Sequence, residues 1–211
     1  MSLAARIKGH IMTASRGRKV EHFYEHFRSG MTVLDAGVSS HEASAENFFL
    51  KTFRGEPRCY TGLGVQDLTR VQAQHPGKTF VTYPGGDFPF DDRQFDWVFS
   101  NAVIEHVGDD DAQLKFLNEM LRVGKNVFFT TPNKFFPVET HTHVPFLHWN
   151  DRLFYAWCER TQRYVSKENL YLFSFGRLRN IVKSSDAVKA EFRKNRLLGW
   201  PMTFTVVCSA R

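Results

Sequence analysis

The chain has 211 residues, of which 42% are hydrophobic and 15% aromatic, and its formal net charge is +6. This length suffices for one sizeable core, so we expect a single domain over residues 1–211. No apolar run approaches the about 18 residues of a membrane span, and the N-terminus lacks the apolar core of a secretory signal, so we expect a soluble, cytoplasmic protein.

The cysteines and the basic residues give little evidence for a metal or redox centre or for a nucleic-acid partner. The three cysteines, Cys59, Cys158 and Cys208, are isolated and form no CxxC pair, which indicates buried packing and not a zinc ribbon or redox centre. The basic residues are dispersed, with some density only over residues 6–19. This pattern is weak support for a nucleic-acid partner and is equally compatible with an anionic small substrate.

The first elements are a helical segment over about residues 1–30 and a strand, turn and helix over residues 31–49. Apolar and aromatic side chains at helical spacing predict a helix over residues 18–27. The stretch MTVLDAGVSSHEASAENFF then predicts a strand over 32–35, a tight turn and a helix over 41–52. Such a unit opens a doubly wound α/β sheet, whose strand ends build a ligand crevice.

Strands and helices go on alternating along the chain, as in a parallel α/β sheet. Strand four, over 95–100, is almost wholly apolar, as expected for a strand that is covered on both faces. We expect the further strands over 59–63, 79–83, 126–131, 188–192 and 203–209, and the further helices over 67–74, 109–122, 153–163 and 166–176.

Five segments carry a family resemblance. VLDAGVSS, GGDFPFDD, FDWVFSNAVIEHV, the helix ending in LRVGK and the strand VFFTTPN resemble, in order and spacing, the core of class I S-adenosylmethionine-dependent methyltransferases of the type 11 kind, over about residues 33–133. The resemblance implies a Rossmann-like, doubly wound, mostly parallel seven-stranded sheet with an antiparallel C-terminal hairpin. It also implies S-adenosyl-L-methionine as the cofactor.

The turn after strand one is the expected site for the methionine end of the cofactor. Gly37 allows the backbone to come close, and the amides of Ala36, Gly37 and Val38 can engage the cofactor. Asp35 would accept from its ammonium group or, alternatively, cap the turn. The family usually has another glycine where this chain has Ser39, which puts the clearance for the cofactor in question.

The ribose position departs from the family pattern. The resemblance places an acidic residue at the end of strand two, but Gly64 stands there. Gln66 or Asp67 can take over the ribose hydroxyls, and the alternative role for Asp67 is to cap the next helix.

The adenine and the reacting end have further candidates. Asp87 and the backbone amide of Phe88 match the family position that contacts adenine. Ser100 and Asn101 end strand four and are expected to line the cofactor or the transferred methyl group.

An unusual stretch, NKFFPVETHTHVPFLHW, opens an expected lid insertion over about residues 133–165. We interpret it as an aromatic-lined substrate wall with His141 or His143 as a general base, or as a packed lid without one. His106 in the IEHV turn is a third candidate, or fixes local backbone. Glu139 and three histidines could hold zinc, but the HxHxxxxH spacing matches no known pattern, so no metal site is expected.

The reaction that this implies is in-line methyl transfer to an oxygen or nitrogen. The resemblance implies a small-molecule or glycan-type acceptor, and SNAV, where nucleobase amino methyltransferases have NPPY, argues against nucleic acid. Two alternatives stay open. One is a non-catalytic binding protein on the same fold, suggested by Ser39 and Gly64. The other is a nicotinamide oxidoreductase, although GVSSHE stands in place of GxGxxG. The oligomeric state is not predicted.

Overall fold

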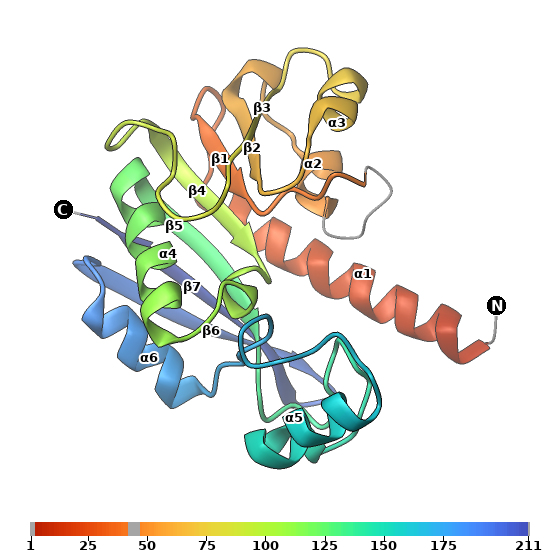
Figure 1. Cartoon of the computed structure of the whole chain (residues 1–211). Helices are drawn as coiled ribbons and strands as arrows, with labels where there is room; N and C mark the ends of the chain where they lie inside the picture. Colours follow the sequence, from red (N-terminus) through yellow and green to blue (C-terminus); the bar gives the residue numbers. More distant parts are fainter. Residues whose placement is uncertain (1–2, 42–46, 211) are drawn as a thin grey trace.

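The chain forms a seven-stranded sheet with the strand order β3-β2-β1-β4-β5-β7-β6 (Figure 1). The structure is a computed structural model that describes residues 3–41 and 47–210. Strands β1 to β5 pair in parallel, and β7 pairs antiparallel with both β5 and β6. The strands are β1 (Val33–Ala36), β2 (Tyr60–Gly64), β3 (Thr79–Thr82), β4 (Phe95–Asn101), β5 (Gly124–Pro132), β6 (Lys189–Leu197) and β7 (Trp200–Ser209). The predicted mostly parallel sheet with an antiparallel C-terminal hairpin is confirmed.

Helices cover both faces of the sheet. They are α1 (Leu3–Tyr24), α2 (Phe48–Thr52), α3 (Thr69–Gln74), α4 (Asp110–Val123), α5 (Asp151–Arg160) and α6 (Phe175–Ser184), with short 3-10 turns at Pro57–Cys59, Ile104–His106 and Leu147–Trp149. Three longer helices start at a side-chain cap, because Asp109, Asn150 and Ser174 each accept a hydrogen bond from a backbone N–H three residues on. Residues 42–46 of the helix expected over 41–52 lie outside the described residues.

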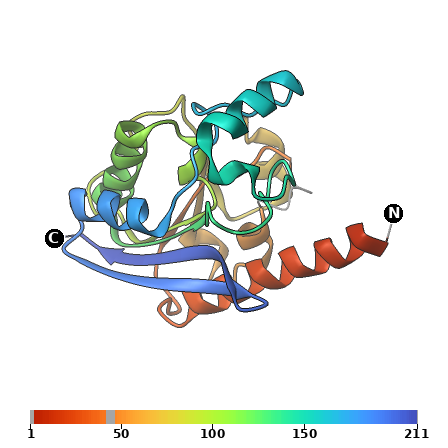
Figure 2. The same cartoon turned by 90° about the horizontal axis from the view of Figure 1, so that it is seen from below.

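Two hydrophobic clusters fill the two sides. On one face, residues of α4 and α6 such as Leu117 and Leu178 pack on β4, β5 and β7. On the other face, α1, α2 and α3 pack on aromatic strand residues, and Phe23 of α1 contacts Trp97, Phe99 and Phe128 edge-on. Figure 2 shows α1 on the opposite side of the sheet from α4 and α6. The strands are therefore covered on both faces, as their apolar sequences predict.

Three boundaries differ from the sequence-based expectation. Helix α1 begins at Leu3 and projects past the sheet. The last helix starts only after Ser174, because Phe173 pairs with Asn133 in a parallel bridge and keeps the preceding segment extended. The final hairpin closes tightly at Leu198 and Gly199, whose φ angles of 48° and 82° suit a two-residue turn, so β6 and β7 run longer than predicted.

The lid follows β5 and leads into α5. An antiparallel bridge between Val138 and Pro145 closes it into a compact loop, and Lys134 Nζ forms an ion pair with Asp151 Oδ2 at 2.6 Å. Because β1, β2, β4 and β5 are parallel, their following turns gather at one edge of the sheet, next to the lid. Among the helices described, none has the length and apolar character to cross a membrane.

Candidate active site

A pocket of about 560 Å³ opens where β1, β2 and β4 end. This volume lies in the range of about 300–1,000 Å³ that is usual for small-molecule sites. Its lining comes from four turns and the start of α4: Ala36, Gly37, Val38, Ser39, Leu63, Gly64, Val65, Gln66, Tyr83, Gly85, Gly86, Asn101, Ala102, Val103, His106, Val107, Ala112, Lys115 and Phe116. The walls are thus mainly backbone and apolar side chains, with a few polar groups.

Gly37 is required by its surroundings. Its φ is +118°, and a Cβ atom built there would lie 2.3 Å from Cγ2 of Val103. Val103 belongs to the turn after β4, in which Ala102 also has a positive φ of 59°. The turns after β1 and β4 therefore touch across the pocket, and only a glycine permits this approach.

Gly64 explains the missing acidic residue at the end of β2. A Cβ atom at Gly64 would lie 2.4 Å from the carbonyl oxygen of Val38. The amides of Gly37 and Val38 both donate to Leu63 O, at 2.9 and 3.0 Å, and hold the turn against β2 at this point. No side chain can stand at position 64 while this turn keeps its place.

Asn47 organises the turn after β1, a role that the sequence reading missed. Its side chain is buried, its Oδ1 accepts from Ser39 N at 2.9 Å, and its Nδ2 donates to the carbonyl oxygens of Ser39 and His41 at 3.0 Å each. Gln66 Oε1 accepts from the hydroxyl of Ser40 at 2.7 Å. Ser39 lines the pocket and is not among the described residues with positive φ, so a serine is accommodated there without a left-handed backbone.

Asp35 and Ser100 hold β1 and do not line the pocket. The Tyr60 hydroxyl donates to Asp35 Oδ2 at 2.5 Å, and burial raises the pKa of Asp35 to about 7, against the hydrogen bond from Tyr60, which lowers it. Ser100 Oγ donates to Ala36 O at 3.0 Å. Asp35, which is expected to accept from the cofactor's ammonium group or to cap the turn, and Ser100, which is expected to line the cofactor, thus each have a partner within the sheet.

The acidic loop residues also have protein partners. Asp87 is exposed and its Oδ1 pairs with Lys115 Nζ at 2.8 Å, and this hydrogen bond lowers the pKa of Asp87. The amide of Phe88, which is expected to contact adenine, donates to Glu119 Oε2 at 2.6 Å and so has a protein partner in this structure. Asp67 accepts from the amide and hydroxyl of Thr69, the first residue of α3, but the N-cap position of this helix is Leu68.

Seven of the predicted site residues lie in the pocket wall and seven do not. Those in the wall are Ala36, Gly37, Val38, Gly64, Gln66, Asn101 and His106. Those outside it are Asp35, Asp67, Asp87, Phe88, Ser100, His141 and His143. Asp87 still lies at the rim, through its ion pair with the wall residue Lys115.

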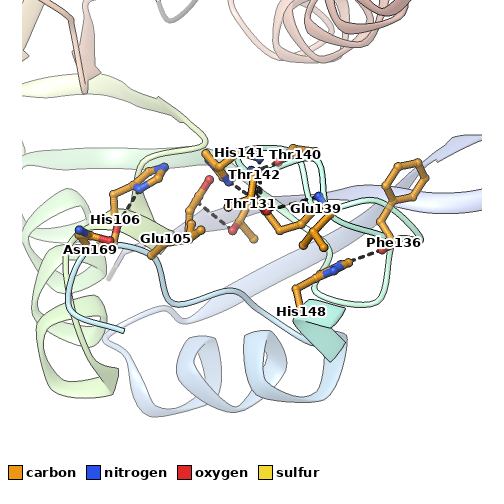
Figure 3. A network of polar contacts seen from close by, with 12 residues as sticks. Glu105, His106, Thr131, Phe136, Glu139, Thr140, His141, Thr142, His148 and Asn169 are labelled. Atoms are coloured by element: carbon orange, nitrogen blue, oxygen red, sulfur yellow. Dashed lines mark hydrogen bonds and ion pairs between the residues drawn. The ribbon is translucent and has the colours of Figure 1, made fainter. Parts of the chain in front are cut away.

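His106 belongs to a polar network that joins the pocket to the lid (Figure 3). Its Nδ1 lies 2.8 Å from Asn169 O, so Nδ1 carries the proton and Nε2 is the acceptor. Its ring meets that of His141 edge-on, with the centroids 4.8 Å apart. Glu105 is fully buried, and its Oε2 accepts from the Thr131 hydroxyl at 3.0 Å.

Inside the lid, Glu139 is the organising group. Its Oε1 lies 2.6 Å from His141 Nδ1, and its Oε2 accepts from the Thr142 hydroxyl at 2.8 Å. Burial favours the neutral carboxyl, but the hydrogen bonds from His141 and Thr142 prevail and lower the pKa of Glu139 to about 2. His148 is buried and contacts Phe136 O at 2.9 Å, so it holds the lid together. His143 donates its backbone N–H to Glu139 O at 2.9 Å.

Lys19 is a further ionisable group that the sequence reading did not single out. It lies on α1 and is buried, and this burial lowers its pKa to about 8, while the negative charge of Glu105 acts in the opposite direction. A buried lysine facing a buried carboxylate marks the place where α1 passes the strand ends.

Comparisons with known proteins agree with this geometry. Residues 63–127 match the family model described as a methyltransferase domain. A stretch of 54 residues is 35% identical to an uncharacterized protein of Mycobacterium tuberculosis, known from strains CDC 1551 and H37Rv, and covers 26% of this chain and 18% of that protein. The matched stretch thus spans less than a fifth of the length of these curated relatives.

Solved structures with this fold include several methyltransferases. One is a SAM-dependent methyltransferase from Methanosarcina mazei, with a TM-score of 0.62 and 15% identity, over 89% of this chain and 96% of that chain. Another is magnesium protoporphyrin IX methyltransferase from Synechocystis with bound SAH, with a TM-score of 0.61 and 10% identity, over 100% and 89%. A third is phosphoethanolamine N-methyltransferase 2 from Haemonchus contortus in complex with phosphomonomethylethanolamine and S-adenosylhomocysteine, with a TM-score of 0.55 and 18% identity, over 84% and 38%.

The predicted resemblance is confirmed by the domain match together with the fold. At these identities the solved structures show a shared architecture, that of the class I S-adenosylmethionine-dependent methyltransferases. The acceptors in their names differ from one relative to the next.

Proposed function

We propose that this chain is an S-adenosyl-L-methionine-dependent methyltransferase that acts on an oxygen or nitrogen of a small-molecule or glycan-type acceptor. The observation that carries the proposal is the pocket of about 560 Å³ at the carboxyl ends of β1, β2 and β4. On this fold, ligands bind at that edge of the sheet. The tight approaches at Gly37 and Gly64 leave no room for a side chain at either position, so backbone forms the wall there, which fits the close approach of a bulky nucleoside cofactor.

The pocket wall divides into regions that suit different parts of the cofactor. The turn at Ala36–Ser39 suits the methionine end, and Gln66 beside Gly64 suits the ribose. Gly85 and Gly86 allow the backbone to lie against the adenine, with Asp87 and Lys115 at the rim. These assignments follow the resemblance to the methyltransferase core, and all of these turns line the pocket.

The reacting end lies at the turn after β4. When bound, the cofactor supplies a methyl group that is already activated by a sulfonium; the acceptor atom bonds to the methyl carbon as the carbon–sulfur bond breaks, and the electron pair stays on sulfur. The chain's own task is to align the acceptor and exclude water. Asn101 and His106 are the polar groups of the wall at this point, and Nε2 of His106 is an acceptor for a proton.

The lid supports a small acceptor with an apolar face. Phe135, Phe146 and Trp149 are exposed, and Trp149 meets the other two edge-on at centroid distances of 6.1 and 5.1 Å. Exposed aromatic clusters of this kind mark binding sites for rings, including the apolar faces of sugars. The fold relatives named for a porphyrin and for phosphoethanolamine support a small acceptor as well.

Calorimetry with S-adenosylhomocysteine tests the cofactor proposal directly. We expect one site per chain and no comparable binding of NADH. Asp87→Asn should weaken binding at least tenfold, because a charged hydrogen bond contributes about 1.5–3 kcal/mol. Asp91→Asn is the matched control, since Asp91 is an exposed carboxylate of the same loop, whereas Asp87 forms an ion pair with the wall residue Lys115. A protein that binds NADH and not S-adenosylhomocysteine would contradict the proposal.

A further inference from the structure

We propose that Glu105, His106 and His141 bind a divalent transition-metal ion of the Zn²⁺ type beside the cofactor pocket. Each residue offers one ligand atom, and the three atoms lie within 4.8 Å of one another. The residues come from the turn after β4 and from the lid, and Figure 3 shows Glu105 between His106 and the lid residues. No metal site is expected from the sequence, in which the candidate ligands are a different set, Glu139 with the lid histidines.

The buried carboxylate is the first argument. Glu105 is 0% exposed, and its Oε1 has no hydrogen-bond partner among the described residues. An unsatisfied buried oxygen costs about 1–3 kcal/mol, and more when it is charged. Lys19 is the nearby cation, yet in the described part of the chain no ion pair joins it to Glu105. A metal ion at this point would satisfy Oε1 directly.

The orientation of the imidazoles is the second argument. His106 Nδ1 is held by the Asn169 carbonyl at 2.8 Å, and His141 Nδ1 by the Glu139 carboxylate at 2.6 Å. Metal-binding histidines are typically held in this way by a carbonyl or a carboxylate at one nitrogen, and they bind the metal through the other. The two rings reach the same point from opposite segments of the chain.

The donor set selects the class of ion. Two imidazole nitrogens and one carboxylate oxygen suit Zn²⁺, Mn²⁺, Co²⁺ or Fe²⁺, whereas Mg²⁺ and Ca²⁺ prefer oxygen ligands. Ligands at about 2.1 Å on a tetrahedral ion lie about 3.4 Å apart, so the three atoms must move closer on binding. Both histidines are exposed, so their rings can shift toward Glu105, which is buried and provides a fixed point.

Three protein ligands leave a coordination position open, as in catalytic metal sites. His106 also lines the cofactor pocket, so the open position would face the acceptor. This role rests on the proposed function: a hydroxyl oxygen bound there would be oriented and would lose its proton to water more readily. In that case His106 acts as a ligand and not as a base.

Calorimetric titration of untagged, chelator-treated protein with Zn²⁺ tests the site. We expect one Zn²⁺ per chain, with Glu105→Gln and His141→Ala each weakening it at least tenfold. His143→Ala is the matched control, because His143 stands two residues after His141 but does not belong to the cluster. The affinity of this variant for Zn²⁺ should equal that of the wild type. Lys19→Met should also retain the site. Thermal unfolding shows that each variant is folded.

The outcomes separate this proposal from the methyltransferase proposal. Binding of S-adenosylhomocysteine without binding of Zn²⁺ overturns the metal site and leaves the enzyme assignment. Binding of Zn²⁺ without binding of S-adenosylhomocysteine overturns the methyltransferase proposal and leaves the metal site. Equal affinity of Zn²⁺ for wild type, Glu105→Gln and His141→Ala, or saturation by Mg²⁺ in place of Zn²⁺, also overturns the metal proposal.

Discussion

Replacing Gly37 with alanine tests the close contact that shapes the pocket. The new Cβ would lie 2.3 Å from Val103 Cγ2 and 3.3 Å from Val103 Cβ, on a backbone with φ +118°. Backbone strain of this kind costs about 1–3 kcal/mol. Overpacking adds about 1–3 kcal/mol, since Val103 is itself held in the turn after β4. We therefore expect Gly37→Ala to lower the free energy of unfolding by about 2–6 kcal/mol and to weaken S-adenosylhomocysteine binding.

Gly85→Ala separates the two costs. Gly85 also lines the pocket and has φ +95°, but a Cβ there meets nothing within 4 Å, so it should carry the backbone cost alone. Gly176→Ala, in α6 with open space around it, should be neutral or stabilising. Urea unfolding and calorimetry measure both quantities. If Gly37→Ala proves no more destabilising than Gly85→Ala, the contact with Val103 does not constrain the site.

Three further changes test the neighbouring residues. Asn47→Ala should weaken S-adenosylhomocysteine about tenfold in calorimetry, because three hydrogen bonds that fix the turn after β1 are lost; unchanged affinity would refute this. Gly64→Asp should destabilise the fold and abolish binding, since its Cβ would lie 2.4 Å from Val38 O, and tighter binding would contradict the argument. The pKa of Asp35 is about 7 when folded against its ordinary 3.8, so the folded state holds this proton more tightly and stability falls as pH rises. Urea unfolding without cofactor should show this fall, about 3 kcal/mol between pH 5 and pH 8, and Asp35→Asn should remove it.

The fold was predictable because its signals are local and repeated. The strands β1, β4 and β5 each contain a short apolar run, and the alternation of strands with helices admits one sheet class. The errors in the predicted element boundaries occur where a residue far away in the sequence determines the local backbone conformation. Phe173 is extended because it pairs with Asn133, forty positions earlier, and helical spacing carries no record of that pairing.

The candidate site was predictable only where backbone makes it. Gly37 and Gly64 line the pocket, since the strand–turn–helix geometry itself places them there. The roles of polar side chains were harder to predict, because a carboxylate or hydroxyl near a strand end can form hydrogen bonds with the protein as well as with a ligand. Asp35 and Ser100 form hydrogen bonds with the protein, to the Tyr60 hydroxyl and to the backbone of β1. Asn47, which fixes the turn, has no family motif to mark it.

The histidines show the same principle at the point where chemistry is proposed. Along the sequence, His141, His143 and His148 stand together with Glu139 and resemble a ligand cluster within one loop. The fold separates them: His148 turns inward to Phe136 O, while Glu139 orients His141. His141 thereby meets Glu105 and His106, which stand 36 and 35 positions earlier, on the turn after β4. A metal site made in this way depends on the lid lying over that turn, so binding of Zn²⁺ also reports whether the lid is in place.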